Sequence, residues 1–241
     1  MPPMSFSASL RYPIVKRQLD ALRPESVVEV GCGMGAMACR LAAAYEYRGY
    51  EPDRRSFETA EHRLDEFGRG EVLNEPLPDA PDRQFDILCA FEVLEHIEDD
   101  SMAMKKWVRW IKPGGSVILS VPANPRRFAV GDAAVGHFRR YDKERLTAVM
   151  NDAGLAVTGL SAWGMPIGYL IEGTRNMILA AGKETGPIEE RTAKSGRLYQ
   201  PIGRVTGRFR ELAMRPFTIA QRPFVNTDLG IGYVAVGRLD R

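Results

Sequence analysis

A short apolar run followed by three closely spaced glycines is the feature that most restricts the fold of this chain. Residues 26–30 read SVVEV, and Gly31, Gly33 and Gly35 follow at once. Glycine has no Cβ atom, so the backbone of such a turn can come close to a ligand. Residues 36–45 favour a helix, whose first N–H groups can bind an anionic or polar group. The sequence therefore predicts a strand, a ligand-binding turn and a helix.

The following residues continue this alternation of strand and helix. Short β-branched runs predict strands, and apolar residues spaced three or four apart predict helices. Further strands are expected at 46–51, 71–73, 85–91, 116–121 and 155–160, and further helices at 12–22, 54–67, 101–111 and 142–152. Strands separated by helices of this length are typical of an α/β fold with a doubly wound, mostly parallel sheet.

The C-terminal third departs from this rhythm. A strand-like run at 229–239 follows the sixth strand with no crossover helix close behind that strand. Between the two, an apolar helix is expected at 167–181, a polar stretch at 182–196 and a basic helix at 205–214. We expect one domain over 1–241, made of an N-terminal helix (1–24), a ligand-binding core (25–160), a helical cap inserted at 161–227 and a closing strand (228–241).

Charge and cysteine content indicate the cellular compartment and restrict the classes of partner. The net charge of the 241-residue chain is +2, yet residues 191–222 hold eight Lys or Arg and one acid. This run favours a solvated face, with an acidic ligand or a peripheral membrane contact as functional alternatives. No nucleic acid is expected, because no nucleic-acid module accompanies the run. Cys32, Cys39 and Cys89 are too few and too scattered for a disulfide framework or a zinc site, so we expect a cytoplasmic protein without a metal.

Two acidic residues and the glycine spacing restrict which ligand the turn can bind. Glu29 lies two residues before Gly31, where it could bind an ammonium group or orient the turn through backbone hydrogen bonds. Glu51 follows Gly31 by 20 residues, the position at which a carboxylate accepts ribose hydroxyls. The spacing G-x-G-x-G differs from the G-x-G-x-x-G of dinucleotide enzymes, which weakens the alternative of a nicotinamide oxidoreductase. S-adenosylmethionine has a ribose, an ammonium group and no pyrophosphate, and it meets all three conditions.

Several motifs, in this order and spacing, resemble the class I S-adenosylmethionine-dependent methyltransferases, particularly the small-molecule and quinone-type enzymes. They are VVEVGCGMG, the acid in YRGYEPD, FDILCAFEVLEHI, IKPGGSVILSVP and GHFRRYDKERLTAVMNDAGL, and together they cover residues 26–154. The resemblance implies methyl transfer to a small-molecule acceptor, acidic or apolar, and a seventh, antiparallel strand inserted beside the sixth. The alternative is a non-catalytic relative that binds a cofactor or a partner, against which the intact turn and Glu51 argue.

The resemblance also implies which residues contact the cofactor. They come from the glycine turn, the second strand, the residues after the third strand, the end of the fourth strand and the N-terminal helix. In that order they are Gly31, Cys32 and Gly33 at the methionine portion, Glu51 at the ribose, Asn74 and Glu75 at the adenine edge, Phe91 and Glu92 beside the cofactor, and Arg11 at its carboxylate. Many relatives carry an Asp near position 74 as the adenine acceptor, whereas here Asn74 or Glu75 must serve.

Two histidines and one glutamate are candidates for catalytic residues. His137 lies in the loop after the fifth strand, and in this fold ligands enter at the carboxyl ends of the strands. It is either the base that takes a proton from the acceptor or a residue that pins the loop with Tyr141 as its partner. Glu95 and His96 have the residue types of a catalytic pair, but we expect them to start the next helix and hold its N-terminus.

Overall fold

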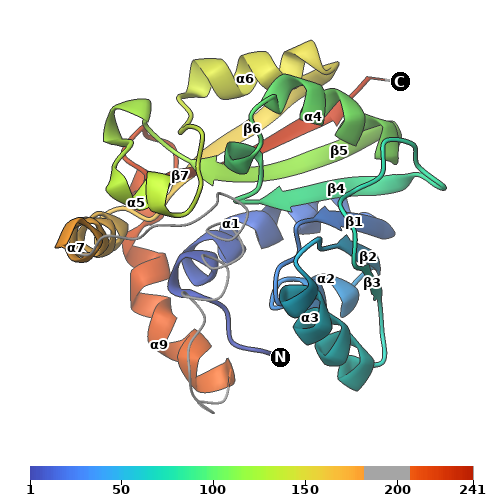
Figure 1. Cartoon of the computed structure of the whole chain (residues 1–241), viewed down its shortest axis with the longest axis horizontal. Coiled ribbons are helices and arrows are strands. Elements are labelled where there is room, and N and C mark those ends of the chain that lie inside the picture. Colours follow the sequence, from blue (N-terminus) through green and yellow to red (C-terminus); the bar gives the residue numbers. More distant parts are fainter. Residues whose placement is uncertain (182–206, 241) are drawn as a thin grey trace.

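The computed structural model describes residues 1–181 and 207–240, and within these ranges seven strands form one sheet (Figure 1). The strand order is β3-β2-β1-β4-β5-β7-β6, and β7 runs antiparallel to both of its neighbours. The strands are β1 (Ser26–Val30), β2 (Glu46–Tyr50), β3 (Glu71–Leu73), β4 (Phe85–Phe91), β5 (Ile111–Pro122), β6 (Leu155–Trp163) and β7 (Gly232–Leu239). The predicted fold, a doubly wound sheet with an antiparallel last strand, is confirmed.

Helices cover both faces of this sheet. The described helices are α1 (Phe6–Leu22), α2 (Ala38–Ala42), α3 (Arg54–Phe67), α4 (Asp100–Trp107), α5 (Val130–Ala134), α6 (Lys143–Asp152), α7 (Ile167–Ala181) and α9 (Gly207–Ala220), with short 3-10 turns η1 (Leu94–His96), η2 (Val108–Trp110), η3 (Pro125–Arg127) and η4 (Arg222–Phe224). Helices α4 and α6 pack their apolar residues on one face, whereas α1, α2 and α3 cover the other (Figure 1). Each face therefore has its own apolar core, and the strands between them are buried.

Most predicted elements match the structure closely, and α1 differs most. It begins at Phe6, where the Ser5 side chain accepts a hydrogen bond from the N–H of Ala8 at 3.2 Å. The sequence predicted a start at residue 12 because the helical spacing of apolar residues begins at Ile14 and Val15. The additional turns are stabilised by tertiary packing, since the Phe6 ring contacts the Phe217 ring of α9 at 5.8 Å between centroids.

The last part of the chain is built into the core. Strand β6 continues past the predicted end at residue 160, because it pairs with β7 as far as Trp163 opposite Gly232. Helix α9 is followed by the buried Gln221, whose Oε1 accepts from the N–H of Gly164 at 3.0 Å and whose Nε2 donates to the carbonyl of Leu10 at 2.7 Å. These bonds tie the segment after α9 to both β6 and α1.

Two of the sequence predictions fall on residues 182–206, which the structure does not describe. They are the polar stretch at 182–196 and the first half of the basic run at 191–222. In the described parts of the chain, no helix has both the length and the apolar character needed to cross a membrane.

Candidate functional site

The three glycines of the turn after β1 serve different purposes. All three have left-handed backbones, with φ of +66° at Gly31, +55° at Gly33 and +78° at Gly35. A Cβ atom at Gly31 would lie 2.7 Å from a methyl group of Val93, and one at Gly35 would lie 2.9 Å from the Cα of Ala60. A Cβ atom at Gly33 would meet nothing within 4 Å. Two glycines therefore permit close packing, while Gly33 faces open space.

The same turn is anchored to the end of β2. The N–H groups of Gly31 and Cys32 donate to the carbonyl of Tyr50 at 2.8 and 3.2 Å. The Cys32 thiol is buried, and burial raises its pKa well above the usual value. This side chain therefore remains uncharged where it lines the turn.

Glu51, directly after β2, is held against the glycine turn. Its side chain is buried, and its two oxygens accept hydrogen bonds from the N–H of Gly33 at 2.8 Å and of Asp53 at 2.9 Å. Burial raises the pKa of this carboxyl, and the two backbone bonds partly offset the shift. A carboxylate oxygen can accept more than one hydrogen bond. The carboxylate is therefore fixed in place and retains the capacity to accept the ribose hydroxyls.

Asn74 and Glu75 lie at the carboxyl end of β3, and both are exposed. The Asn74 amide nitrogen donates to the carbonyls of Glu51 at 2.9 Å and of Pro52 at 3.2 Å. These bonds join the residues after β3 to the end of β2. The amide oxygen of Asn74 is an acceptor, which is the group that the predicted contact with adenine needs.

Arg11 brings a buried cation from α1 to the end of β4. Its Nη1 lies 3.1 Å from Glu92 Oε1, and its guanidinium packs over the rings of Phe91 at 5.4 Å and Trp163 at 5.6 Å. Its Nε is buried and has no hydrogen-bond partner among the described residues, and the 3.1 Å contact of Nη1 with Glu92 lacks the geometry of a hydrogen bond. A buried hydrogen-bond donor without an acceptor lowers the stability of the fold. A carboxylate from a ligand would supply the missing acceptors, which agrees with the predicted role of Arg11.

Glu92 adopts an unusual backbone conformation at the carboxyl end of β4. Its φ is +58°, a left-handed value that is uncommon outside glycine and is frequent at functional sites. Hydrogen bonds to Ser120 hold it there, from the Glu92 N–H to the Ser120 carbonyl and from the Ser120 hydroxyl to Glu92 Oε1, each 2.9 Å. The structure thus places Arg11, Phe91 and Glu92 in one group.

Glu29 lies inside β1 and has a partner that the sequence did not indicate. The Tyr47 hydroxyl donates to its carboxylate at 2.6 Å. Burial raises the pKa of Glu29 to about 7, although the Tyr47 hydrogen bond and the charge of Arg11 act in the opposite direction. The carboxyl is therefore only partly ionised near pH 7, and a nearby ammonium group would favour its ionised form.

The raised pKa of Glu29 predicts that stability falls as pH rises. Between its ordinary pKa of 4.5 and about 7, the folded chain holds a proton that the unfolded chain has lost. The free energy of unfolding should then decrease by about 1.4 kcal/mol per pH unit. The stabilising contribution is complete below the lower pKa and is lost as pH rises through the higher one. This change is the contribution of Glu29 alone, so in denaturant unfolding without cofactor the wild-type chain should lose that much more stability per pH unit than Glu29→Gln does; equal slopes would contradict the assignment.

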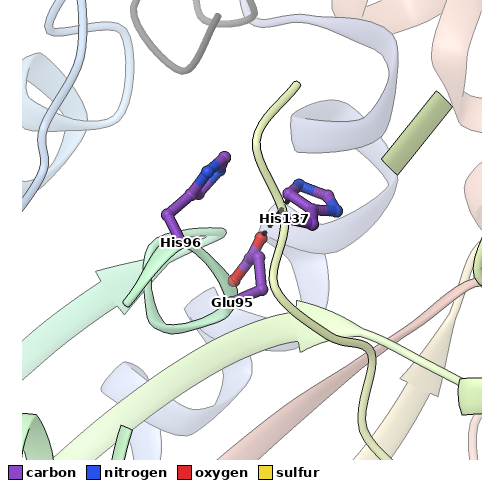
Figure 2. A group of neighbouring side chains, drawn as sticks. All are labelled: Glu95, His96 and His137. Carbon is purple, nitrogen blue, oxygen red and sulfur yellow. Dashed lines mark ion pairs between the residues drawn. The ribbon is translucent and has the colours of Figure 1, made fainter. Parts of the chain in front are cut away.

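His137 lies after α5, where buried charges fix its orientation. Its Nδ1 pairs with Asp132 Oδ1 at 3.0 Å, and its Nε2 lies 3.8 Å from Glu95 Oε1 (Figure 2). Burial acts to raise the pKa of Asp132, but hydrogen bonds from His137 and Arg140 outweigh it and lower the pKa to about 2. Tyr141 was the wrong partner for a His137 that pins the loop, because the Tyr141 hydroxyl donates to Asp100 at 2.9 Å and His137 pairs with Asp132.

Glu95 and His96 do not hold the N-terminus of the next helix, so that expectation is wrong. Asp99 caps α4 by accepting from the N–H of Met102 at 2.9 Å, whereas Glu95 and His96 belong to the preceding turn η1. Glu95 is fully buried, and burial together with the charge of Glu92 raises its pKa well above the usual value. Burial lowers the pKa of His96 to about 3, so its ring is neutral at physiological pH.

A network of buried charges beside His137 was not anticipated from the sequence. Arg140 is buried and pairs with Asp132 at 2.9 Å and with Glu172 of α7. Arg127 also contacts Glu172, at 2.5 Å, and packs over the Tyr169 ring. The network connects the loop that carries His137 to α7, the first helix of the segment expected to form a cap. The only local signal was the high density of charge in the motif GHFRRYDKER.

The sheet and the residues at its carboxyl edge together define a class of protein. A glycine turn after β1, a carboxylate after β2 and an antiparallel β7 between β5 and β6 are the arrangement of a Rossmann-like methyltransferase. The family model for the methyltransferase domain matches residues 9–160, and the chain belongs to this family. The predicted class, a class I methyltransferase with S-adenosylmethionine as its cofactor, is confirmed.

Curated and solved relatives agree with this assignment. A ubiquinone biosynthesis O-methyltransferase from Alkalilimnicola ehrlichii is 31% identical over 125 residues, which is 49% of this chain and 51% of that protein. The YcgJ protein from Bacillus subtilis has a TM-score of 0.61 at 15% identity, covering 95% of this chain and 99% of that one. The N-methyltransferase NodS from Bradyrhizobium japonicum, solved with S-adenosyl-L-homocysteine, has a TM-score of 0.54 at 13% identity, covering 95% and 89%. The two structures show the shared fold, and the chain matches about half the length of the curated relative.

The described residues fit the cofactor of this family. The open space at Gly33 is a place that a Cβ atom would enter, and the buried donors of Arg11 need an acceptor. Glu51 offers a fixed carboxylate beside Gly33. A ligand with a carboxylate and a ribose satisfies both charged groups at once.

Proposed function

We propose that this chain transfers a methyl group from S-adenosylmethionine to a hydroxyl oxygen of a small, quinone-type acceptor. The observation that carries the proposal is the buried Arg11 guanidinium, whose Nε has no hydrogen-bond partner among the described residues and which lies with Glu92 and Phe91 at the carboxyl end of β4. The likeness to ubiquinone biosynthesis O-methyltransferases supports the choice of acceptor and of oxygen as the methylated atom. Bound S-adenosylmethionine supplies a methyl group that is already activated by the sulfonium.

The chain then mainly positions the two reactants. In this proposal Arg11 binds the cofactor carboxylate, Glu51 binds the ribose hydroxyls, and Gly31, Cys32 and Gly33 line the methionine portion. Glu29 faces the ammonium group, Asn74 or Glu75 accepts from adenine, and Phe91 and Glu92 flank the cofactor. Alignment of the donor with the acceptor and exclusion of water can together contribute up to about 7–11 kcal/mol.

His137 is proposed to act on the acceptor side. Its Nδ1 is held by Asp132 at 3.0 Å, so its Nε2 is the nitrogen available to a neighbouring group. A phenolic acceptor keeps its proton at neutral pH and must lose it for efficient attack on the methyl group. Asp132 is a positioning residue in this account, because it acts through His137.

The segment 161–227 is proposed to cover the acceptor. Support comes from Glu172 of α7, which is buried against Arg140 in the same network that holds His137. We further propose a cytoplasmic location, in which the three cysteines remain free thiols. A peripheral contact of the basic run with an anionic membrane would bring apolar quinone precursors to the cap.

A methylation assay tests the proposal directly. The full chain is incubated with S-adenosylmethionine and a panel of phenolic quinone precursors, and mass spectrometry monitors the gain of one methyl group. His137→Gln should lower kcat/KM by about 10²–10⁴-fold. His62→Gln should have no effect, because His62 is exposed on α3. Calorimetry with S-adenosylmethionine separates the alternatives: binding without turnover on any acceptor would favour the non-catalytic relative.

A further inference from the structure

Gln221 is a buried amide that joins the N-terminal helix to the end of β6. The residue is 3% exposed, and both polar atoms of its side chain have partners. Its Oε1 accepts from the N–H of Gly164 at 3.0 Å, and its Nε2 donates to the carbonyl of Leu10 in α1 at 2.7 Å. Leu10 directly precedes Arg11, and Gly164 directly follows Trp163. One side chain therefore connects the backbone beside Arg11 to the backbone beside a ring against which Arg11 packs.

The first half of α1, which carries Arg11, has a gap in its backbone hydrogen bonds. Pro13 lies inside the helix and has no N–H group, so the helical bond from residue 13 to the carbonyl of Ser9 cannot form. Helices in proteins are stabilised mainly by tertiary packing, and a missing backbone bond increases this dependence. The segment between β6 and β7 supplies part of the packing, through the Gln221 amide and through Phe217 of α9, which lies along α1 (Figure 1). The position of Arg11 therefore depends on residues near the other end of the chain.

The Arg11 guanidinium is buried in an incomplete environment. It packs over the rings of Phe91 at 5.4 Å and of Trp163 at 5.6 Å. Its Nε and the indole N–H of Trp163 are both buried, and neither has a hydrogen-bond partner among the described residues. Because a buried donor without an acceptor is unfavourable, the surrounding structure must hold these groups in place until a ligand supplies the acceptor. Gln221 contributes to this on the backbone side, since it fixes the separation between α1 and the end of β6.

We propose that Gln221 is a positioning residue for the cofactor. It aligns the Arg11 guanidinium with Trp163, and Arg11 in turn binds the carboxylate of S-adenosylmethionine. This inference rests on the proposed function, which assigns the carboxylate to Arg11. It adds that the segment between β6 and β7, proposed above to cover the acceptor, also determines the affinity for the methyl donor. Gln221 had no sequence signal, because its partners lie 57 and 211 positions away.

An effect that acts through Arg11 has a signature that general loss of stability lacks. Decarboxylated S-adenosylmethionine keeps the adenine, ribose, sulfonium and ammonium groups of the cofactor and lacks only its carboxylate. A displaced Arg11 should weaken binding of the complete cofactor and leave binding of the decarboxylated compound nearly unchanged. A general distortion of the fold should weaken binding of both compounds alike. The ratio of the two dissociation constants therefore reports on Arg11.

Calorimetry measures both affinities in the full chain. Gln221→Met keeps the length of the side chain and removes both hydrogen bonds. It should weaken S-adenosylmethionine binding by about 3–30-fold and change binding of the decarboxylated compound by less than about twofold. Gln84→Met is the matched control, because Gln84 is exposed and its amide donates to the carbonyl of Arg109 in η2, and this variant should bind both compounds as wild type does. An equal loss for the two compounds in Gln221→Met would overturn the proposal.

Arg11→Gln separates this proposal from the proposed function. Alone, it should weaken binding of S-adenosylmethionine selectively. Adding Gln221→Met to it should cause no further loss, because the effects of two residues that act as one unit are not additive. Fully additive losses would overturn the role of Gln221. Equal losses for the two compounds in Arg11→Gln would instead mark a failure of the proposed function, since the carboxylate would then not bind to Arg11.

Hydrogen exchange provides a test that needs no variant. The Gly164 amide proton is held by Gln221, and a ligand whose affinity depends on this contact must in return stabilise it. Each compound is added at the same multiple of its dissociation constant, so that both stabilise the whole fold equally. S-adenosylmethionine should then slow exchange of this proton more than the decarboxylated compound does. Equal exchange rates would overturn the proposal, even if Gln221→Met does not fold.

Discussion

Gly33→Val is expected to abolish binding of S-adenosylmethionine and to leave the sheet intact. The Gly33 backbone has φ of +55°, and the space where its side chain would begin is open. A branched side chain there would occupy the volume assigned to the methionine portion, and the left-handed backbone would add about 1–2 kcal/mol of strain. Calorimetry should detect no heat of binding at concentrations that saturate wild type, which means a loss of at least about 100-fold.

Gly68→Val provides a matched control for this variant. Gly68 ends α3 with φ of +70°, and a Cβ atom there also meets nothing within 4 Å. This variant has comparable backbone strain at a position remote from the turn after β1, so it should lose stability and keep its affinity for the cofactor. Native affinity in a folded Gly33→Val protein would show that the open space belongs to something other than the cofactor.

Glu51→Ala should weaken S-adenosylmethionine binding by at least one to two orders of magnitude. Each hydrogen bond from a ribose hydroxyl to a carboxylate is worth about 1.5–3 kcal/mol, and two would be lost. The variant also removes the acceptors for the N–H groups of Gly33 and Asp53, so the turn loses its support. Calorimetry measures the affinity, and circular dichroism checks that the fold persists.

Two further variants separate ribose binding from general damage. Glu51→Gln keeps one acceptor oxygen near Gly33 and should have an affinity between those of Glu51→Ala and wild type. Glu58→Ala removes an exposed carboxylate that pairs with Arg54 on the surface of α3, and it should bind normally. An unchanged affinity of Glu51→Ala for S-adenosylmethionine would refute the ribose assignment.

The elements around the cofactor were predictable because their signals are local. A β-branched run, glycines two residues apart and a carboxylate at the end of the next strand all lie between residues 26 and 51. The structure places Glu51 and Gly33 in direct contact, at 2.8 Å. The residue that caps α6, Asp142, was also predictable, since its side chain accepts from the N–H of Arg145 only three residues away.

The acceptor side was harder to predict because it depends on which charges become buried. Asp132 of α5 and His137 and Arg140 of the following loop belong to a charged part of the sequence, which does not show which of these side chains face the interior. The decisive contacts also come from distant segments, such as Glu172 to Arg140 and Glu95 to His137. The partners of His137 were therefore assigned wrongly, although its place in the loop was correct.

The position of β7 has a consequence for how this chain is made. Strand β7 is the last strand along the chain, yet it lies in the sheet between β5 and β6, which are synthesised earlier. Until residues 232–239 leave the ribosome, β5 has an unpaired edge and β6 has no neighbour to join. Unpaired edges of apolar strands favour association with other chains. Nascent chains that stall after β6 should therefore need a chaperone, and they should aggregate when it is depleted.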